Sequence, residues 1–182
     1  MQVKDVIKLA CEMTDNNDLI DAIDNNNLTD DEQVTIDCLV GCFNLINNEV
    51  ASEYIPLLHK ETMKTQNFKI NFDDFSKKML EIISIKDKFE RNVKYKQFDN
   101  YLMTNANEVE IIYSYLPEDV GINNEISSLL PERVFAYGIT REYFFMQSMF
   151  DDAQLWDSRF KNSLRVLTRK KGEIKMPKRS FL

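Results

Sequence analysis

Glycine is scarce in this 182-residue chain, and its scarcity limits the kinds of ligand site that the chain can contain. Only four glycines occur, at positions 41, 121, 138 and 172. A phosphate-binding loop needs several glycines within a few residues, because its backbone must approach the phosphate groups closely. The spacing therefore excludes a Gly-rich phosphate loop.

Histidine and cysteine are few as well. His59 is the single histidine, and the cysteines are Cys11, Cys38 and Cys42. No known motif ties a serine or cysteine to His59, so a catalytic pair would need the fold to assemble it. Cys38 and Cys42 could join His59 at a metal ion, but zinc sites use four ligands at recognisable spacings. We interpret the cysteines as buried core thiols in a reducing intracellular compartment, and expect no metal, no cofactor and no enzymatic activity.

Long hydrophobic runs are also missing. No stretch of about 18 apolar residues occurs, so the sequence predicts no membrane contact. Lys4, Asp5 and Lys8 interrupt the apolar residues at the N-terminus, which is not typical of a signal peptide. The hydrophobic fraction of 43% and the charged fraction of 29% are those of an ordinary globular protein.

Positive charge is sparse until the end of the sequence. Residues 1–167 contain 17 basic and 29 acidic residues, a net charge of −12. Residues 168–182, "TRKKGEIKMPKRSFL", contain six basic residues and one acidic residue, a net charge of +5. The two parts of the chain are therefore expected to face different neighbours.

Acidic clusters lie within residues 15–24, 30–32, 73–74 and 151–152. Paired carboxylates can hold Mg²⁺ or Ca²⁺. The EF-hand pattern fails because no glycine falls within the first two clusters. Two clusters stand where helices are expected to begin, and negative charge is favourable at a helix N-terminus. We interpret the clusters as helix caps and solvated surface.

Periodicity predicts helices in the first part of the chain. One begins at Val3, and a short one lies around Leu19–Ile23. Thr29 and Glu32 form a capping-box motif that begins a helix over about residues 30–54. Its buried stripe is predicted to be Ile36, Leu39, Phe43, Ile46 and Val50. Gly41 within it indicates close packing against a neighbouring element, since glycine costs up to about 1 kcal/mol relative to alanine there.

The hydrophobic period changes between residues 57 and 116. Phe68, Ile70 and Phe72 alternate with polar residues, and the region is rich in Ile, Tyr and Phe. We predict a small antiparallel β insertion of four or five short strands. The hydrophobic period of part of this region is ambiguous, so a short helix over residues 72–80 is the alternative there.

Two further helices are predicted over residues 131–167. Pro131 suits the first helical position, and the segment that follows is apolar nearly all round, which predicts a central helix. Its aromatic run Tyr143–Phe145 could stack nucleic-acid bases. Its neighbours are acidic, so we interpret it as core. The second helix shows an amphipathic stripe made of Ala153, Trp156, Phe160, Leu164 and Leu167.

These elements together predict an α+β fold that is mainly α. We expect a helical bundle (helices over about 3–54 and 131–167) with a small antiparallel β insertion (about 57–116), which together form one domain over residues 1–167. An extended basic C-terminal tail follows over residues 168–182.

Residues 129–167 carry a resemblance to a known family. The motif F-D-x-A-x-x-W-x-x-R-F is present as Phe150, Asp151, Ala153, Trp156, Arg159 and Phe160, followed by Leu164 in the same predicted stripe. The segment resembles the C-terminal helical hairpin of tailed-phage head-to-tail connector (adaptor) proteins, the group that includes tail tubular protein A.

This resemblance implies a structural virion protein made in the host cytoplasm and located in the neck of the virion. Such adaptors form a homo-oligomeric ring, commonly of twelve subunits, that joins the portal protein to the downstream tail or tail-nozzle protein. DNA passes through the lumen of the ring as cargo.

The resemblance also implies that an extended C-terminal segment grips the portal. The docking residues would be Arg169, Lys170, Lys171, Lys175, Lys178, Arg179, Phe181 and Leu182. A frayed, solvated end and a nucleic-acid arm are the alternatives. The terminal Phe181 and Leu182 favour docking on a protein, because a phosphate-binding arm gains little from two large apolar residues.

A different function class also fits the negative charge. An acidic phage-encoded module that mimics DNA would inhibit a host DNA-binding protein. A mimic needs a regular acidic stripe, whereas the acidic residues here cluster at helix starts and the chain ends in basic residues. The connector is therefore the preferred hypothesis.

Overall fold

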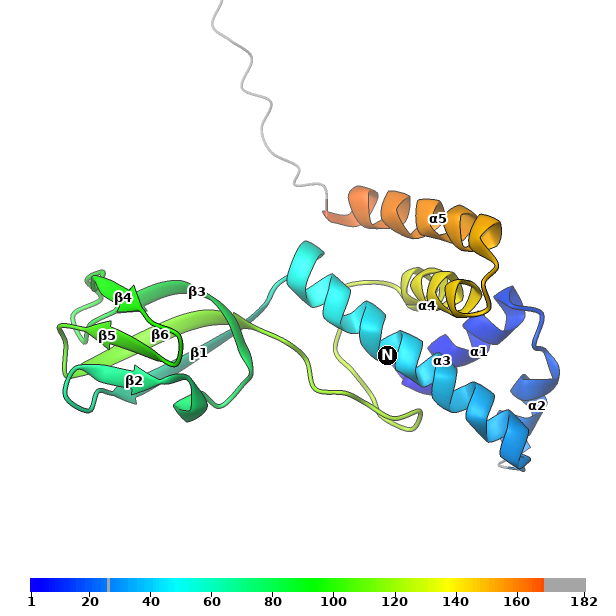
Figure 1. Ribbon diagram of the computed structural model, residues 1–182, viewed down its shortest axis with the longest axis horizontal. Coiled ribbons are helices and arrows are strands. Elements are labelled where there is room, and N and C mark those ends of the chain that lie inside the picture. The colour runs from blue at the N-terminus through cyan, green and yellow to red at the C-terminus, as the bar shows by residue number, and fades with distance from the viewer. Residues whose placement is uncertain (26, 169–182) are drawn as a thin grey trace, which may run out of the picture.

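The computed structural model describes residues 1–25 and 27–168 and shows a chain that mixes helices with antiparallel sheets, as the sequence predicts (Figure 1). The α-helices of this part of the chain are α1 (Val3–Met13), α2 (Asp18–Asn25), α3 (Asp30–Glu49), α4 (Glu132–Met146) and α5 (Phe150–Thr168). The strands are β1 (Leu57–Lys64), β2 (Lys69–Asn71), β3 (Met79–Lys86), β4 (Tyr95–Gln97), β5 (Tyr101–Thr104) and β6 (Glu108–Tyr115). All but the first residue of the predicted tail lies outside the described residues.

The helices α1–α5 form one lobe around α4. Helix α4 packs against α1, α3 and α5, so the prediction of a central helix is confirmed for its first half. The residues that it buries are Val134, Phe135, Ala136, Gly138, Ile139 and Thr140. Pro131 lies one position before the helix rather than at its first position, with φ −64° and ψ 148°. No helix in the described part of the chain is both long and apolar enough to cross a membrane.

Helix α3 begins and packs as its sequence predicts. The Thr29 backbone N–H donates to Glu32 Oε2 at 2.7 Å, and the Glu32 N–H donates to Thr29 Oγ1 at 3.4 Å, which completes the capping box. All five residues of the predicted inner stripe are buried. The helix continues into a π-helical turn over Val50–Tyr54, which leads to β1.

The prediction that Gly41 packs closely within the chain is wrong. A Cβ atom at Gly41 would meet nothing within 4 Å, because this residue lies on the outer side of α3. The close approach occurs instead at Gly138 on α4. A Cβ there would lie 2.8 Å from Ile46 Cγ2, so the missing side chain lets α4 press against α3.

The substitution Gly138→Ala is therefore expected to destabilise the protein by about 1–3 kcal/mol, because the added methyl group overpacks the α3–α4 contact. Gly41→Ala is the matched control and is expected to be neutral or to stabilise by up to about 1 kcal/mol. Urea unfolding of both variants measures the difference. Equal stability of the two variants would contradict the close packing at Gly138.

The region 57–116 forms a second lobe, the β lobe, with a core of its own. One sheet has the order β1-β6-β3 and the other has the order β2-β5-β4, both antiparallel. Six strands form rather than four or five, because residues 95–104 fold into two very short strands, β4 and β5. The alternative short helix reduces to a 3-10 turn over Phe72–Asp74, and residues 79–86 form β3.

The two lobes bury separate clusters of residues. In Figure 1 the β lobe lies to one side of the helices and is joined to them by two connections, one after α3 and one before α4. Each lobe therefore offers its own outer surface for contacts.

Candidate functional site

The motif residues of the α4–α5 hairpin lie mostly where their spacing predicts. Ala153, Phe160 and Leu164 are buried along the side of α5 that faces α4. Trp156 is half-buried, and its ring centre lies 5.6 Å from that of Tyr137 on α4. Asp151 is exposed in the first turn of α5, where its carboxylate interacts favourably with the positive end of the helix dipole.

Phe150 and Asp151 of the predicted hairpin motif, and Leu167 of the predicted stripe, lie outside the core. Phe150 is 59% exposed as the first residue of α5, and Leu167 is exposed near its end. Helix α5 has 19 residues and α4 has 15, so α5 is longer than the helix that it packs against. The amphipathic stripe shows which side of α5 can be buried. A residue on that side is buried only where a neighbouring element covers it.

The prediction that the aromatic run at the end of α4 is core is confirmed only in part, because Tyr143 packs against the helical core and Phe145 does not. Tyr143 and Phe144 are half-buried, and Phe145 is exposed with its ring centre 5.4 Å from that of Phe150. Ser148 takes a φ of 61° where the chain turns between the two helices. The hairpin therefore ends in an exposed apolar tip, which we define as Phe145, Met146, Met149 and Phe150.

Arg141 ties three helices together. Its guanidinium contacts Glu49 on α3, with Nη1 to Oε1 at 3.2 Å, Asp157 Oδ1 on α5 at 3.1 Å, and Glu142 Oε1 at 2.7 Å. It also lies 5.0 Å from the centre of the Phe160 ring. Burial alone would lower the pKa of Arg141, but the hydrogen bond and charge of Glu49 leave it raised above its ordinary value. The hairpin is thus fixed to the end of α3 by charged groups that are far apart in sequence.

The Asp157 carboxylate makes this cluster sensitive to acid. Burial alone would raise the pKa of Asp157, but hydrogen bonds from Lys161 and Arg141 hold it below its ordinary value. A lowered folded-state pKa contributes stability above the unfolded-state pKa of about 3.9 and loses it as the pH falls through the folded-state value.

Asp157→Asn is accordingly expected to cost about 1.5–3 kcal/mol at neutral pH, which is the range for a hydrogen bond to a charged group. The difference from the unaltered protein should begin to shrink as the pH falls below about 4, where the Asp157 carboxyl becomes protonated in the unfolded state, and it should be smallest below the folded-state pKa, where the carboxyl is protonated in both states. Urea unfolding over a pH series measures it. A difference that is independent of pH would contradict the role of the Asp157 charge.

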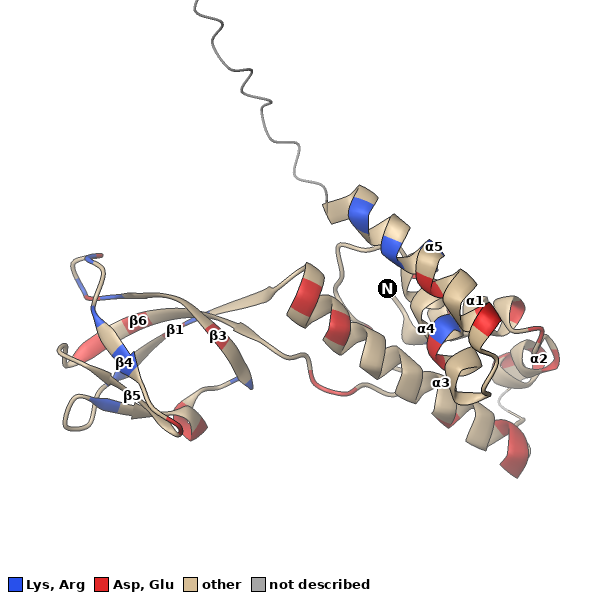
Figure 2. Ribbon diagram, turned by 45° about the horizontal axis from the view of Figure 1, so that its top comes forward, with Lys and Arg blue, Asp and Glu red and all other residues tan. Residues whose placement is uncertain are grey.

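The two lobes differ in net charge (Figure 2). The helical segments 1–56 and 117–168 contain seven basic and 20 acidic residues, a net charge of −13, whereas residues 57–116 contain ten basic and nine acidic residues. Residues 9–59 contain eleven acidic residues and no lysine or arginine. The negative charge of the chain is therefore a property of the helical lobe.

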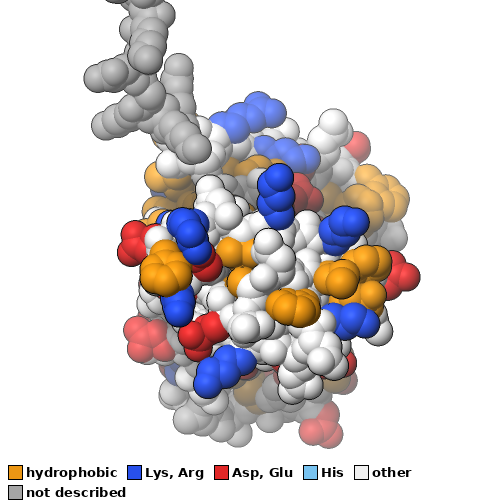
Figure 3. Space-filling model, turned by 90° about the vertical axis from the view of Figure 1, so that its left-hand side faces the viewer, with side chains coloured by type: hydrophobic (Ala, Val, Ile, Leu, Met, Phe, Trp, Pro, Cys, Tyr) orange, Lys and Arg blue, Asp and Glu red, His pale blue; other side chains and the backbone are white. Residues whose placement is uncertain are grey.

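The free end of the β lobe exposes lysine and arginine side chains among hydrophobic and acidic ones (Figure 3). Lys88 Nζ and the Arg91 guanidinium lie 4.9 and 5.0 Å from the centre of the exposed Phe89 ring. Lys69 Nζ lies 4.6 Å from the centre of the Tyr101 ring. This surface differs in charge and composition from that of the helical lobe.

The cysteines do not form a metal centre with the histidine. Within residues 1–25 and 27–168, no group of three or more His, Cys, Asp or Glu side chains is placed to hold a metal ion. Cys38 and Cys42 contact Met146 Sδ at 3.8 and 3.7 Å. Cys11 and Cys42 are core thiols as predicted, and burial raises the pKa of Cys42 to about 12, whereas Cys38 is half-buried on the outer side of α3.

A hydrogen-bond network around His59 is not apparent from the sequence. Its Nε2 lies 3.1 Å from Ser76 Oγ, and the Tyr113 hydroxyl donates to Glu61 Oε1 at 2.6 Å. Glu61 also accepts from the Ser76 backbone N–H at 3.4 Å. The carboxylate therefore orients Tyr113 and the Ser76 loop rather than the imidazole, unlike the acid of a catalytic triad. The network ties β1 and β6 to the turn before β3.

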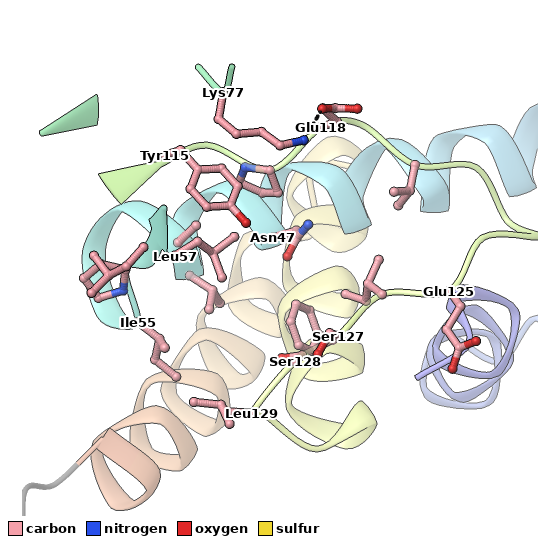
Figure 4. A pocket seen from close by; sticks show the side chains of 18 residues that line it. Asn47, Ile55, Leu57, Lys77, Tyr115, Glu118, Glu125, Ser127, Ser128 and Leu129 are labelled. Atoms are coloured by element: carbon pink, nitrogen blue, oxygen red, sulfur yellow. Dashed lines mark hydrogen bonds and ion pairs between the residues drawn. The ribbon is translucent and has the colours of Figure 1, made fainter. Parts of the chain in front are cut away.

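An open cavity of about 630 Å³ lies where the two lobes meet (Figure 4). Its wall is mostly apolar and comes from the end of α3, the start of β1 and residues 117–129, with Ile55, Leu57 and Leu129 among its members. An ion pair of 2.8 Å joins Lys77 of the β lobe to Glu118 of the second connection. The cavity and this pair mark the junction between the lobes.

Comparisons with known proteins assign no family to this chain. No protein-family model matches the chain, and no curated protein sequence matches it.

Proposed function

We propose that this chain is a structural virion protein, a head-to-tail connector that forms a ring between the portal and the tail and lets DNA pass through its lumen. The observation that carries the proposal is the motif over Phe150–Phe160 in the hairpin of α4 and α5. The two-lobed layout supports it, because a connector must contact different proteins at its two ends.

In this proposal residues 1–167 act as one adaptor domain whose helices form the bundle of the ring body. The β lobe, with its basic and aromatic free end, contacts the downstream tail or tail-nozzle protein. The net charge of −13 on the helical segments disfavours tight DNA binding, because carboxylates and phosphates repel each other. A conduit benefits from this property, since DNA has to move through it as cargo.

The portal contact is assigned to residues 168–182, with the basic residues on an acidic portal surface and Phe181 and Leu182 in an apolar pocket. Ordering such a segment costs about 1–2 kcal/mol per residue in backbone entropy. Several segments bound at once in a ring offset this cost through their high effective concentration.

One observation favours the DNA-mimic alternative. Residues 9–59 contain eleven carboxylates and no lysine or arginine. Several of these groups have local partners, however, which lessens their resemblance to a row of phosphates. Asp24 pairs with Lys4 and Lys8, and Glu32 caps α3.

The experiment that tests the proposal mixes the purified full chain with the portal protein encoded by the same genome. Native mass spectrometry is expected to show a stoichiometric complex with one ring of this chain on each portal. A complex with one host DNA-binding enzyme, together with no portal binding, would overturn the connector proposal and support the mimic.

A further inference from the structure

The apolar tip of the α4–α5 hairpin lies exposed at one end of both helices. Its four side chains are exposed by 60% at Phe145, 60% at Met146, 44% at Met149 and 59% at Phe150. Single exposed apolar residues are common on protein surfaces, whereas a group of four large ones is typical of a contact site. The tip is therefore a candidate docking surface.

Hollows adjoin the tip on two sides. One has a volume of about 380 Å³ and is lined by Phe145, Phe150 and Gln154. The other has a volume of about 470 Å³ and lies against α3, with Met146 and Cys42 in its wall. Pockets that bury small ligands have volumes of about 300–1,000 Å³, so each hollow has room for a large apolar side chain.

Acidic side chains surround the tip. Asp151 and Asp152 follow Phe150 directly and are exposed in the first turn of α5. Glu142 lines the first hollow, and the exposed Asp119 lines the second. A segment that matches this surface must therefore carry basic residues next to apolar ones.

The basic side chains near the tip are already engaged within the helical lobe. Arg141 and Lys161 line the first hollow. Arg141 is 12% exposed and contacts three carboxylates, and Lys161 pairs with Asp157 at 2.9 Å. Arg159 lies over the ring of Trp156, more than two helical turns from the start of α5. The exposed carboxylates therefore determine the charge beside the tip.

Residues 169–182 have the composition that this surface requires. They contain six basic residues and one acidic residue, and they end in Phe181 and Leu182. Lys178 and Arg179 precede this apolar pair by a few positions, as Asp151 and Asp152 adjoin the apolar residues of the tip. Opposite charges steer such an encounter, and burial of the apolar side chains stabilises the contact.

The segment is long enough to reach the tip of its own chain. Helix α5 spans about 27 Å from Phe150 to Thr168, at a rise of about 1.5 Å per residue. The fourteen residues that follow it can extend to at most about 50 Å. A covalently linked segment also has an effective concentration on the order of 1 mM at its site, which favours it over the segment of a separate copy in dilute solution.

We propose that residues 169–182 dock on the apolar tip of the same chain in the free subunit. Phe181 and Leu182 occupy the hollows beside the tip, and the basic residues before them face Asp151 and Asp152. The biological role of this contact rests on the proposed function, because the portal is assigned the same segment. The free subunit then keeps its portal-binding residues covered, and the portal has to compete for them.

Disulfide trapping in the full chain tests the contact. Ser180→Cys places a thiol beside Phe181, and Gln154→Cys places one in the wall of the first hollow. Every chain also carries Cys38→Ser, which removes the half-buried native thiol near the tip. Under mild oxidation a disulfide is expected to form within one chain, at a rate that does not change when the protein is diluted. Peptide mapping identifies the linked pair.

Asn162→Cys with Ser180→Cys is the matched control. Asn162 is exposed on α5 and lies nearer than Gln154 to the start of the segment, so random encounters favour Asn162. Docking reverses this order, and the link to Gln154 is expected to form at least about tenfold faster because its effective concentration is higher. A link to Gln154 that is equal to or slower than the link to Asn162 would overturn the proposal. So would disulfide-linked dimers whose rate of formation rises with protein concentration, since they assign the tip to a second copy.

Variants of the apolar side chains test what holds the segment. Phe181→Ala with Leu182→Ala is expected to remove the tenfold advantage of the Gln154 link. Phe145→Gln is expected to do the same from the side of the tip, and its fold should be kept because Phe145 is exposed. Circular dichroism checks the fold of each variant. An advantage that persists in both variants would overturn the docking of the apolar residues.

The portal separates this inference from the proposed function. With the disulfide between positions 154 and 180 closed, the chain is expected to lose portal binding, and reduction is expected to restore it. Equal portal binding by the closed and the reduced chain would overturn the proposal that docking covers the portal-binding residues. Fast closure in a chain that binds no portal in either state would support the contact and reject the connector function.

Discussion

Replacement of Arg141 by methionine is expected to destabilise the helical lobe by about 3–5 kcal/mol, the cost of removing one partner from a buried ion cluster. The Arg141 side chain is only 12% exposed and compensates the charges of Glu49, Glu142 and Asp157, of which Asp157 also pairs with Lys161. Methionine keeps much of the volume but leaves three carboxylates close together with only Lys161 to compensate them. Trp156, the only tryptophan, lies in the same lobe, so its fluorescence during urea unfolding reports on this lobe specifically.

Arg159→Met provides the matched control. Arg159 is exposed on α5, and its guanidinium lies 4.6 Å from the centre of the Trp156 ring. A cation–π contact at an exposed site contributes about 0.5–1 kcal/mol, so this variant should lose far less stability. Arg141→Lys is expected to fall between the two, because lysine keeps the charge but cannot contact Glu49 and Asp157 through a planar fork. Similar unfolding midpoints for Arg141→Met and Arg159→Met would show that the cluster contributes little.

The features that the sequence predicts correctly are local ones. The capping box at Thr29 involves residues three apart, and the inner stripe of α3 follows from the helical period alone. The β insertion falls within residues 57–116 because strand-forming residues are concentrated there. Each of these features depends on neighbours in sequence, so one chain contains enough information to find it.

The features that the sequence fails to predict depend on contacts between distant residues. Arg141 and Glu49 are 92 positions apart, and nothing in either segment indicates that they meet. Gly41 and Gly138 look alike in sequence, yet only Gly138 faces a neighbouring helix within the chain. Leu167 belongs to the predicted amphipathic stripe of α5, but it is exposed near the end of the helix. An apolar pattern shows which side a helix can bury, and the fold decides how much of that side is covered.

Removal of residues 169–182 is expected to abolish portal binding while leaving both lobes folded. The clusters that α1–α5 and β1–β6 bury are formed by residues up to Leu164, so far-ultraviolet circular dichroism should show unchanged helix and strand content. The removed segment contains six basic residues and one acidic residue, and it includes Phe181 and Leu182. Loss of a multivalent attachment weakens ring binding by about a hundredfold or more. Co-sedimentation of the truncated chain with portal particles measures the loss.

Two full-length variants distinguish the contributions within the segment. Substitution of all six basic residues by glutamine is expected to weaken binding most at low salt, because screening already reduces the charge contribution at high salt. Phe181→Ala with Leu182→Ala is expected to weaken binding equally at both salt concentrations, because apolar burial does not depend on charge screening. If truncation leaves portal affinity unchanged, the portal contact must lie on the lobes, and the basic segment is then available for another acidic partner.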